Sequence, residues 1–262
     1  MIQPLAYVDP QAKIADNVVI EPFVTIHRNV EIGEGTWIGS NVTIFEGARI
    51  GKNCKIFPGA VISAAPQDLK YKGESSFLFI GDNTVIRECV TLNKGTALDK
   101  NKTVIGSNCL IMAYVHVGHD CIIGDNVIIA NSVQLAGHIE VQDHVYIAGT
   151  CAVHQFVKIG AHAMIAGGSL VRKDVPPYTK AGREPLSYEG VNSIGLRRRG
   201  YTTEKISEIQ EIYRILYLRG HNNSKAISII EKEMEPTRER DEILSFIRDS
   251  DRGVMKGYIS RS

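Results

Sequence analysis

The chain has 262 residues and a formal net charge of +1, with 30 Lys and Arg residues against 29 Asp and Glu residues. This balance gives no general electrostatic preference for nucleic acid or for an anionic membrane surface. The chain has no run of about eighteen apolar residues and no basic start followed by an apolar segment, so it predicts neither stable membrane insertion nor a secretory signal.

An aliphatic residue recurs at every sixth position from Val8 to Ile62, from Ile80 to Leu92 and from Ile105 to Val171. A period of six fits neither an α-helix nor a sandwich, and it is typical of a parallel β-helix in which each hexapeptide forms one short side of a coil. Three sides make a coil of about eighteen residues, which predicts about eight coils stacked about 4.8 Å apart. The aliphatic residues are expected to point inward and form the core.

Two residue types mark the expected corners of the coils. When the aliphatic residue is counted as position one, glycine is common at position two and asparagine at position four (Gly33, Gly39, Gly51, Gly81, Gly106, Gly118, Gly124 and Gly160; Asn17, Asn29, Asn41, Asn53, Asn83, Asn108 and Asn126). Both residue types tolerate left-handed backbone angles. We expect both positions to supply the corners.

The five cysteines form no C-x-x-C pair, which favours a reducing compartment, so a cytoplasmic protein is expected. Four of them lie four places after the aliphatic residue of a hexad, in a slot otherwise filled mainly by Val, Ala or Thr (Cys54, Cys109, Cys121 and Cys151). Small buried thiols suit such a slot. These cysteines are predicted to be packing residues.

Two segments break the rhythm. Residues 68–79 replace two hexads, and residues 98–104 insert a short stretch. A loop that interrupts a stiff repeat usually lies on the surface and often carries function. For the second segment, a tolerated insertion is an equally good interpretation.

The repeat stops after Val171, and Pro176-Pro177 closes it. An extended stretch is expected up to Gly200, followed by a helix with Thr202 or Thr203 as its N-cap and Gly220 as its stop. Shorter helices are predicted at about 224–235 and 238–249. The predicted organisation is therefore an all-β parallel β-helix over 1–176, with loop excursions at 68–79 and 98–104. An extended linker and a small α-helical C-terminal domain then cover 177–262.

The repeat also brings histidines together. The hexads that begin at positions 117, 135 and 153 are eighteen residues apart, so they stack on one side of three successive coils. Because neighbouring coils are about 5 Å apart, four imidazoles are expected along one edge of the rod (His116, His119, His138 and His154). His144 and His162 are likewise expected to stack with each other on a different side.

Clustered imidazoles suit two chemistries. Histidine is the natural general acid or base near neutral pH, and three histidines are also a common ligand set for zinc. A third interpretation is a row of solvated corner residues without function.

Motifs outside the regular hexads narrow this choice. They are Gln67 to Tyr71, His116 to Asp120, Leu135 to His138, His154 to Phe156, Asp174 to Tyr178 and Val191 to Gly200. In these motifs the chain resembles the family of bacterial UDP-N-acetylglucosamine acyltransferases, which belong to the hexapeptide-repeat acyltransferases. The resemblance implies a left-handed coil and the first step of lipid A synthesis, in which an acyl group passes from acyl carrier protein to the 3-hydroxyl of UDP-N-acetylglucosamine.

The resemblance also implies roles for three residues. His119 corresponds to the general base that takes the proton of the sugar hydroxyl, and Asp120 to the carboxylate that orients the imidazole. Gly137 corresponds to the glycine whose backbone N–H stabilises the oxyanion. His119 and Asp120 are adjacent in sequence, so they can meet only if the corner turns both side chains the same way.

Further residues match substrate contacts of the family (Gln67, Asp68, Lys70, His116, His138, His154, Gln155, Asn192, Arg198 and Arg199). The basic run Arg197–Arg199 also suits an acidic acyl carrier protein; the alternative for Lys70 and for this run is that they are solvated surface charges. Gly167 stands where the family limits acyl-chain length, and its missing side chain implies a long 3-hydroxyacyl group of about fourteen carbons or more. The alternative is that Gly167 is only a corner glycine. Ile194 departs from the Glu or Val that members often carry, so a carboxylate contact with the nucleotide is not expected there.

The family resemblance implies acyl carrier protein and UDP-N-acetylglucosamine as substrates and a homotrimer with active sites between neighbours. It implies no cofactor, no metal and no nucleic-acid partner. Three alternatives compete with it: a zinc enzyme of the carbonic-anhydrase kind, a non-catalytic structural β-helix, and the N-acyltransferase of the same pathway. The last normally carries an extra domain before its β-helix, whereas the hexads here begin at Val8.

Overall fold

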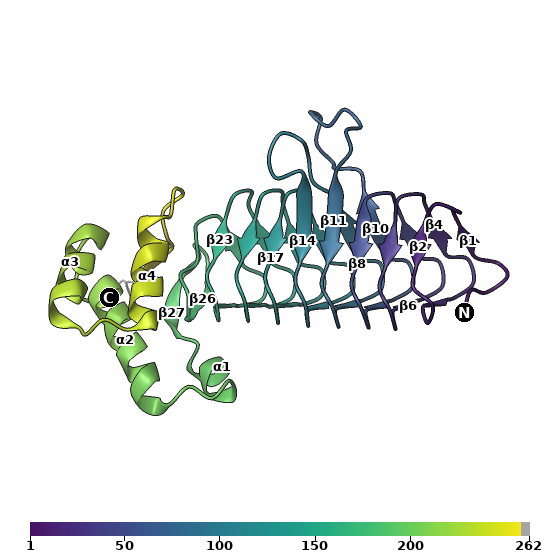
Figure 1. Cartoon of the computed structure of the whole chain (residues 1–262). Helices are drawn as coiled ribbons and strands as arrows, with labels where there is room; N and C mark the ends of the chain where they lie inside the picture. Colours follow the sequence, from purple (N-terminus) through teal and green to yellow (C-terminus); the bar gives the residue numbers. More distant parts are fainter. Residues whose placement is uncertain (258–262) are drawn as a thin grey trace.

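Each hexad folds into a strand that is mostly two residues long and ends at its inward-pointing aliphatic residue. In the computed structural model, which describes residues 1–257, strands one coil apart pair in parallel, as Tyr146 does with Met164. Three sheets result, which run along a rod (Figure 1). The predicted left-handed parallel β-helix, followed by a helical region, is confirmed.

The first two sheets meet at the corner that carries the histidines. The nine-stranded sheet is formed by β1 (Tyr7–Val8), β4 (Thr25–Ile26), β7 (Thr43–Ile44), β10 (Val61–Ala64), β13 (Thr91–Asn93), β16 (His116–Val117), β19 (Gln134–Leu135), β22 (Ala152–Val153) and β25 (Leu170–Val171). The eight-stranded sheet is formed by β2 (Lys13–Ile14), β5 (Glu31–Ile32), β8 (Ala48–Ile50), β11 (Phe77–Ile80), β14 (Lys102–Ile105), β17 (Ile122–Ile123), β20 (Glu140–Val141) and β23 (Lys158–Ile159).

The third sheet has eleven strands and continues beyond the hexads. It is formed by β3 (Val19–Ile20), β6 (Trp37–Ile38), β9 (Lys55–Ile56), β12 (Val85–Ile86), β15 (Leu110–Ile111), β18 (Ile128–Ile129), β21 (Tyr146–Ile147), β24 (Met164–Ile165), β26 (Thr179–Gly182), β27 (Ser187–Val191) and β28 (Lys256–Gly257). The last three strands tie the end of the coil to the C-terminal region.

The aliphatic residues of the hexads fill the interior of the rod, as predicted. Ile44, Leu92 and Ile147 are fully buried, whereas Val8 and Ile14 at the N-terminal end are only partly buried. The four position-five cysteines are buried and free. Burial raises the pKa of the Cys121 thiol to about 12, so it stays protonated at neutral pH and serves as a packing group.

The prediction for the corners is correct for the asparagines and wrong for the glycines. Six of the seven position-four asparagines, from Asn29 to Asn126, have φ between 53° and 60° and make the left-handed turns. The prediction for the position-two glycines was wrong, because none of them has a positive φ. At Gly106 a Cβ would lie 2.4 Å from the carbonyl oxygen of Gly124, so close stacking of coils excludes a side chain there.

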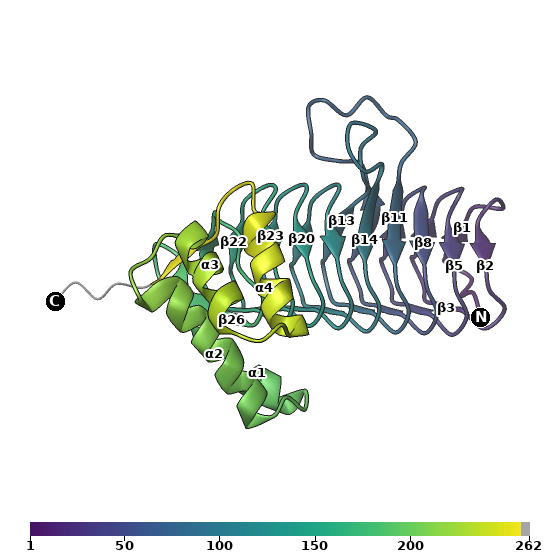
Figure 2. The same cartoon turned by 60° about the vertical axis from the view of Figure 1, so that its left-hand side comes forward.

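Both interruptions form loops on the corner between the nine-stranded and eight-stranded sheets. The first loop joins β10 to β11 and the second joins β13 to β14, and they rise side by side from one flank of the rod (Figures 1 and 2). They also contact each other, because the Ala97 N–H donates to Glu74 Oε1. Their position beside the predicted histidines favours the functional interpretation of both segments.

The C-terminal region lies at the end of the rod opposite the N-terminus (Figure 1) and contains α1 (Ser193–Arg198), α2 (Thr203–Leu218), α3 (Asn223–Glu233) and α4 (Arg238–Arg248). The three longer helices and the Thr202 N-cap agree with the prediction. The extended stretch expected up to Gly200 is present as two strands, where β26 pairs with β24 and β27 returns antiparallel to it. It ends earlier than predicted, because residues Ser193–Arg198 form α1. Asn192 then caps α1 by accepting the Gly195 N–H.

A second hydrophobic core holds the helices together and against the last coil. The Tyr213 hydroxyl donates to the carbonyl of Pro177, and the Tyr178 hydroxyl donates to Glu242 at 2.6 Å. Residues 258–262 of the predicted second domain lie outside the described residues. Within residues 1–257, every helix is too short or too polar to cross a membrane.

Candidate active site

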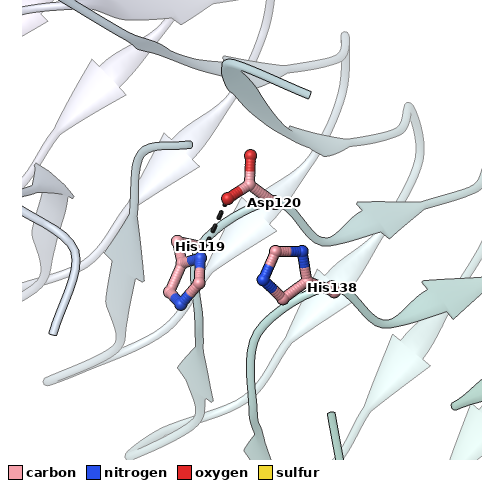
Figure 3. A group of neighbouring side chains, drawn as sticks. All are labelled: His119, Asp120 and His138. Carbon is pink, nitrogen blue, oxygen red and sulfur yellow. Dashed lines mark hydrogen bonds and ion pairs between the residues drawn. The ribbon is translucent and has the colours of Figure 1, made fainter. Parts of the chain in front are cut away.

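The corner after β16 turns two adjacent side chains toward each other. Asp120 has φ +58°, a left-handed angle that this short polar residue tolerates. The result is a contact of 2.9 Å between His119 Nδ1 and Asp120 Oδ2, shown in Figure 3. Both residues are buried, at 6% and 0% exposure. The geometric condition set by the sequence is therefore met.

The second loop holds the Asp120 carboxylate in place. It accepts hydrogen bonds from the Thr96 N–H, from the Thr96 hydroxyl at 2.7 Å and from the Lys100 N–H. Burial would raise the pKa of this carboxyl, but the hydrogen bonds from His119 and Thr96 outweigh it and keep the pKa below its ordinary value. Asp120 is thus a fixed, ionised partner for the imidazole.

The second ring nitrogen of His119, Nε2, lies between the first loop and the corner that contains Gly137. Nε2 lies 4.0 Å from Asp68 Oδ2 of the first loop. On its other side is Gly137, where a Cβ would come within 2.8 Å of His119 Nε2 and Cε1. The Gly137 N–H has no hydrogen-bond partner among residues 1–257. A proton acceptor and a free backbone donor therefore lie side by side.

His138 packs beside this pair. Its ring centroid is 4.8 Å from that of His119, with the planes at 86°, and both rings are labelled in Figure 3. Phe156 of the next coil stacks on His138 at 4.4 Å. The Nδ1 atom of His138 lies 2.6 Å from Asp99 Oδ2 of the second loop. The ring is therefore held on one face and at one nitrogen.

The other two predicted histidines lie farther out on the same edge. His116 on β16 contacts the Thr91 hydroxyl through Nδ1 at 2.8 Å. Burial, with a smaller contribution from His119, lowers the pKa of His116. His154 is exposed and contacts the Gln155 carbonyl. Gln155 is exposed and aligns with Gly137 one coil away, in the register of β19 and β22.

A cavity of about 660 Å³ opens between the two loops and the coils, and we call it the loop cavity. Its lining includes Asp68 and Lys70 from the first loop, Thr96, Leu98, Asp99 and Lys100 from the second, and His138, Glu140 and Phe156 from the coils. Asp68 accepts the Lys70 N–H, which shapes the start of the first loop, and Gln67 is exposed just before it. Charged groups of both signs thus surround a space beside His138.

Three predicted contacts lie at a different corner of the rod, between the eight-stranded and eleven-stranded sheets. Asn192 donates to the His162 carbonyl, Arg199 donates to the His144 carbonyl at 2.8 Å, and Arg198 is exposed nearby. A single chain therefore does not bring these residues to His119. Gly167 is exposed at the remaining corner, between the eleven-stranded and nine-stranded sheets. A Cβ added to Gly167 would lie 3.3 Å from the Gly149 carbonyl oxygen.

His144 and His162 stack as predicted, with ring centroids 4.8 Å apart, and Tyr178 continues the stack. Burial, reinforced by Arg199, lowers the pKa of His162 from 6.5 to about 4. Between about pH 4 and pH 6.5, His162 is therefore neutral in the folded chain but protonated in the unfolded chain. Stability from this group is complete above about pH 6.5 and is lost as the pH falls toward 4.

We expect acidification from pH 6.5 to 4.5 to lower the free energy of unfolding by about 1–2 kcal/mol through this partly exposed ring. The variant His162→Phe keeps the stacking and removes the titration, so its urea midpoint should fall less over this range. The exposed His221 supplies the control, since His221→Gln should keep the wild-type slope. Equal slopes in wild type and His162→Phe would contradict the prediction.

The site also bears on the zinc alternative. Among residues 1–257, His119, Asp120 and His138 are the only group of three or more His, Cys, Asp or Glu residues whose potential ligand atoms all lie within 4.8 Å of one another. The Asp120 carboxylate already accepts three hydrogen bonds from the second loop, and Nδ1 of each histidine already faces a carboxylate. This donor set does not match a three-histidine zinc site.

Sequence reasoning missed the residues that support the site from the second loop. They are Thr96, Asp99 and Lys100, together with Thr103, whose hydroxyl accepts the Asp120 N–H at 2.8 Å. The available signal was the break in the hexads at 98–104, which pointed to the loop and not to individual side chains.

Comparisons with known proteins identify the family. Three family models match: "Udp N-acetylglucosamine O-acyltransferase; Domain 2" over residues 174–255, "Bacterial transferase hexapeptide (six repeats)" over 102–137, and "GMPPB C-terminal domain" over 2–98. A relative from Chlorobium phaeobacteroides, named as an acyl-(acyl-carrier-protein)–UDP-N-acetylglucosamine O-acyltransferase, is 62% identical over 253 residues, 96% of each chain. The chain belongs to this family of O-acyltransferases.

Solved structures of O-acyltransferases from this family have the same fold. The UDP-N-acetylglucosamine acyltransferase of Bacteroides fragilis has a TM-score of 0.96 and 50% identity, covering 98% of this chain and 100% of its own. The enzyme of Francisella novicida has a TM-score of 0.95 and 43% identity, covering 98% and 94%. The predicted family and the predicted class of enzyme are confirmed, which sets aside the zinc enzyme and the purely structural β-helix.

Proposed function

We propose that the protein transfers a 3-hydroxyacyl group from acyl carrier protein to the 3-hydroxyl of UDP-N-acetylglucosamine, as the first step of lipid A synthesis in the cytoplasm. The donor and acceptor are those in the names of its relatives. The observation that carries the proposal is the buried His119–Asp120 pair, whose second nitrogen lies beside Gly137 and next to the loop cavity.

His119 acts as general base in this mechanism. Nε2 takes the proton of the sugar hydroxyl as the oxygen attacks the thioester carbonyl, because a hydroxyl is a weak nucleophile until its proton leaves. Asp120 accepts the Nδ1–H and stabilises the imidazolium that forms. When the tetrahedral intermediate collapses, the C–S bond breaks and the imidazolium gives its proton to the departing thiolate sulfur, so that the carrier leaves as a thiol.

Gly137 supports the intermediate. Its free N–H is a donor for the developing oxyanion, and one such donor contributes roughly 3–4 kcal/mol in other acyl-transfer enzymes. The missing side chain allows the thioester carbon to approach both this N–H and His119 Nε2. Proton acceptor and oxyanion donor are then on adjacent coils.

Substrate contacts are proposed around this centre. Asp68, Lys70 and His138 line the loop cavity, where the lysine suits a phosphate of the nucleotide. His116, His154, Gln155 and Gln67 extend the same edge. Asn192, Arg198 and Arg199 belong to a different corner, so their proposed contacts with nucleotide or carrier come from a neighbouring chain of a homotrimer.

An acyl-transfer assay tests the function. The purified protein, given UDP-N-acetylglucosamine and 3-hydroxyacyl carriers of graded length, is expected to form the 3-O-acyl product and to prefer chains of about fourteen carbons or more, since each buried methylene contributes about 0.8 kcal/mol. Hydrolysis without transfer, or no product, would reject the reaction.

Chain length is tested separately at Gly167. The variant Gly167→Met places a side chain in the open corner beside Gly149 and should shift the preference toward shorter carriers. A wild-type preference for about ten carbons or fewer, or an unchanged preference in Gly167→Met, would remove Gly167 as the length-determining residue while leaving the reaction in place.

A further inference from the structure

Asp99 is a carboxylate to which the family resemblance assigns no role. It stands in the second loop, thirty-nine residues before His138 in sequence, yet its Oδ2 lies 2.6 Å from His138 Nδ1. Its own side chain is 35% exposed and that of His138 only 15%. A short contact to a mostly buried imidazole is a stronger constraint than an ordinary surface ion pair.

The loop that carries Asp99 is itself anchored at the catalytic pair. The Lys100 N–H donates to Asp120 Oδ1, and Lys100 Nζ lies 3.3 Å from both Asp99 Oδ2 and the Asp120 carbonyl. Residues 96–100 therefore supply the Asp99 carboxylate to His138 and donate hydrogen bonds to the Asp120 carboxylate beside His119. The two imidazole rings lie at 86° to each other. Asp99 is fixed relative to His119 as well as to His138.

His138 has one group left for a ligand. One face of the ring stacks on Phe156, the ring lies at 86° to that of His119, and Nδ1 faces Asp99. A carboxylate at Nδ1 selects the tautomer with the proton on that nitrogen, because the carboxylate only accepts. Nε2 is then the ring nitrogen available to a molecule in the loop cavity, which both Asp99 and His138 line.

We propose that Asp99 is a positioning residue that fixes His138 in its Nδ1–H form and thereby presents Nε2 to the sugar nucleotide. The inference rests on the proposed function for the identity of the ligand. A hydroxyl or the acetamide N–H of the sugar would donate to Nε2. Asp99 acts through His138 and does not itself touch the substrate.

The test combines a spectroscopic and a kinetic readout on the full chain. In the ¹⁵N-histidine-labelled protein, with the His138 signal assigned by its loss in His138→Gln, the wild type should show the Nδ1–H form. Asp99→Ala should shift it to the Nε2–H form that free imidazole favours. The KM for UDP-N-acetylglucosamine should rise about tenfold with little change in kcat, as expected for a lost binding contact.

Two further variants sharpen the comparison. Asp99→Asn keeps a side-chain oxygen that can accept the His138 Nδ1–H, so its KM should lie between those of the wild type and Asp99→Ala. If Asp99→Ala does not fold, Asp99→Asn is compared with the wild type instead. Asp16→Ala removes an exposed carboxylate from the N-terminal part of the rod, outside the lining of the loop cavity, and should change neither readout. A matched loss in Asp16→Ala would point to net charge and overturn the proposal.

Unchanged His138 signals and KM in Asp99→Ala and Asp99→Asn would also overturn it. The tautomer measurement does not depend on turnover. A wild type that shows the Nδ1–H form but transfers no acyl group would therefore reject the proposed function while supporting the Asp99–His138 pair.

Discussion

Replacement of His119 by Ala is expected to lower kcat for acyl transfer about 1,000-fold, within the usual range for loss of a general base. The reason is local: the variant loses the imidazole that takes the sugar proton beside Gly137, and Asp68 Oδ2 lies 4.0 Å from the position of the lost Nε2. The KM for the sugar nucleotide should change much less than kcat. Steady-state rates with a 3-hydroxyacyl carrier measure both.

A second histidine on the same scaffold supplies the control. His27 stacks on Phe45 at 4.7 Å on the nine-stranded sheet, several coils before the loop cavity. His27→Ala should keep the wild-type rate, and both variants should keep the wild-type circular dichroism because neither removes an inward-pointing core residue. A His119→Ala enzyme that retains more than about a tenth of the rate would contradict the base assignment.

The β-helix itself was readable from the sequence because its periodicity is strict. Each aliphatic residue has one possible environment, the interior, and the register of eighteen follows once three sides are assumed. The role of glycine was not readable in the same way. Glycine is required at position two because the backbone of the next coil lies too close for a side chain, as at Gly106, where a Cβ would lie 2.4 Å from the Gly124 carbonyl oxygen. The sequence alone does not give this distance between coils.

The contact between His119 and Asp120 was predictable because the two residues are neighbours within one regular corner. Their support was not, because Thr96 and Asp99 belong to a loop that leaves the repeat. Loop contacts depend on backbone hydrogen bonds such as Lys100 N–H to Asp120, which no periodicity encodes. The same limit applied after Val171, where β26 and β27 continue a sheet without any hexad pattern.

The second large effect is expected from Gly137→Ala, which should lower kcat about 100-fold, the scale of a misplacement of about 1 Å in a catalytic group. The new methyl would lie 2.8 Å from His119 Nε2 and Cε1, closer than any real contact of this kind. The backbone at this corner is held by hydrogen bonds to neighbouring coils, so the imidazole must move. Its Nδ1 contact to Asp120 should lengthen as it does.

Gly137→Ala keeps the backbone N–H, so a double-mutant cycle can show which group the methyl disturbs. If it acts by displacing the imidazole, adding it to His119→Ala should lower the remaining rate only a few-fold, because the displaced group is already absent. If the same 100-fold loss recurs in the His119→Ala background, the methyl instead disturbs the geometry of the oxyanion donor. The first outcome would establish that the position of the imidazole requires a residue without a side chain at 137.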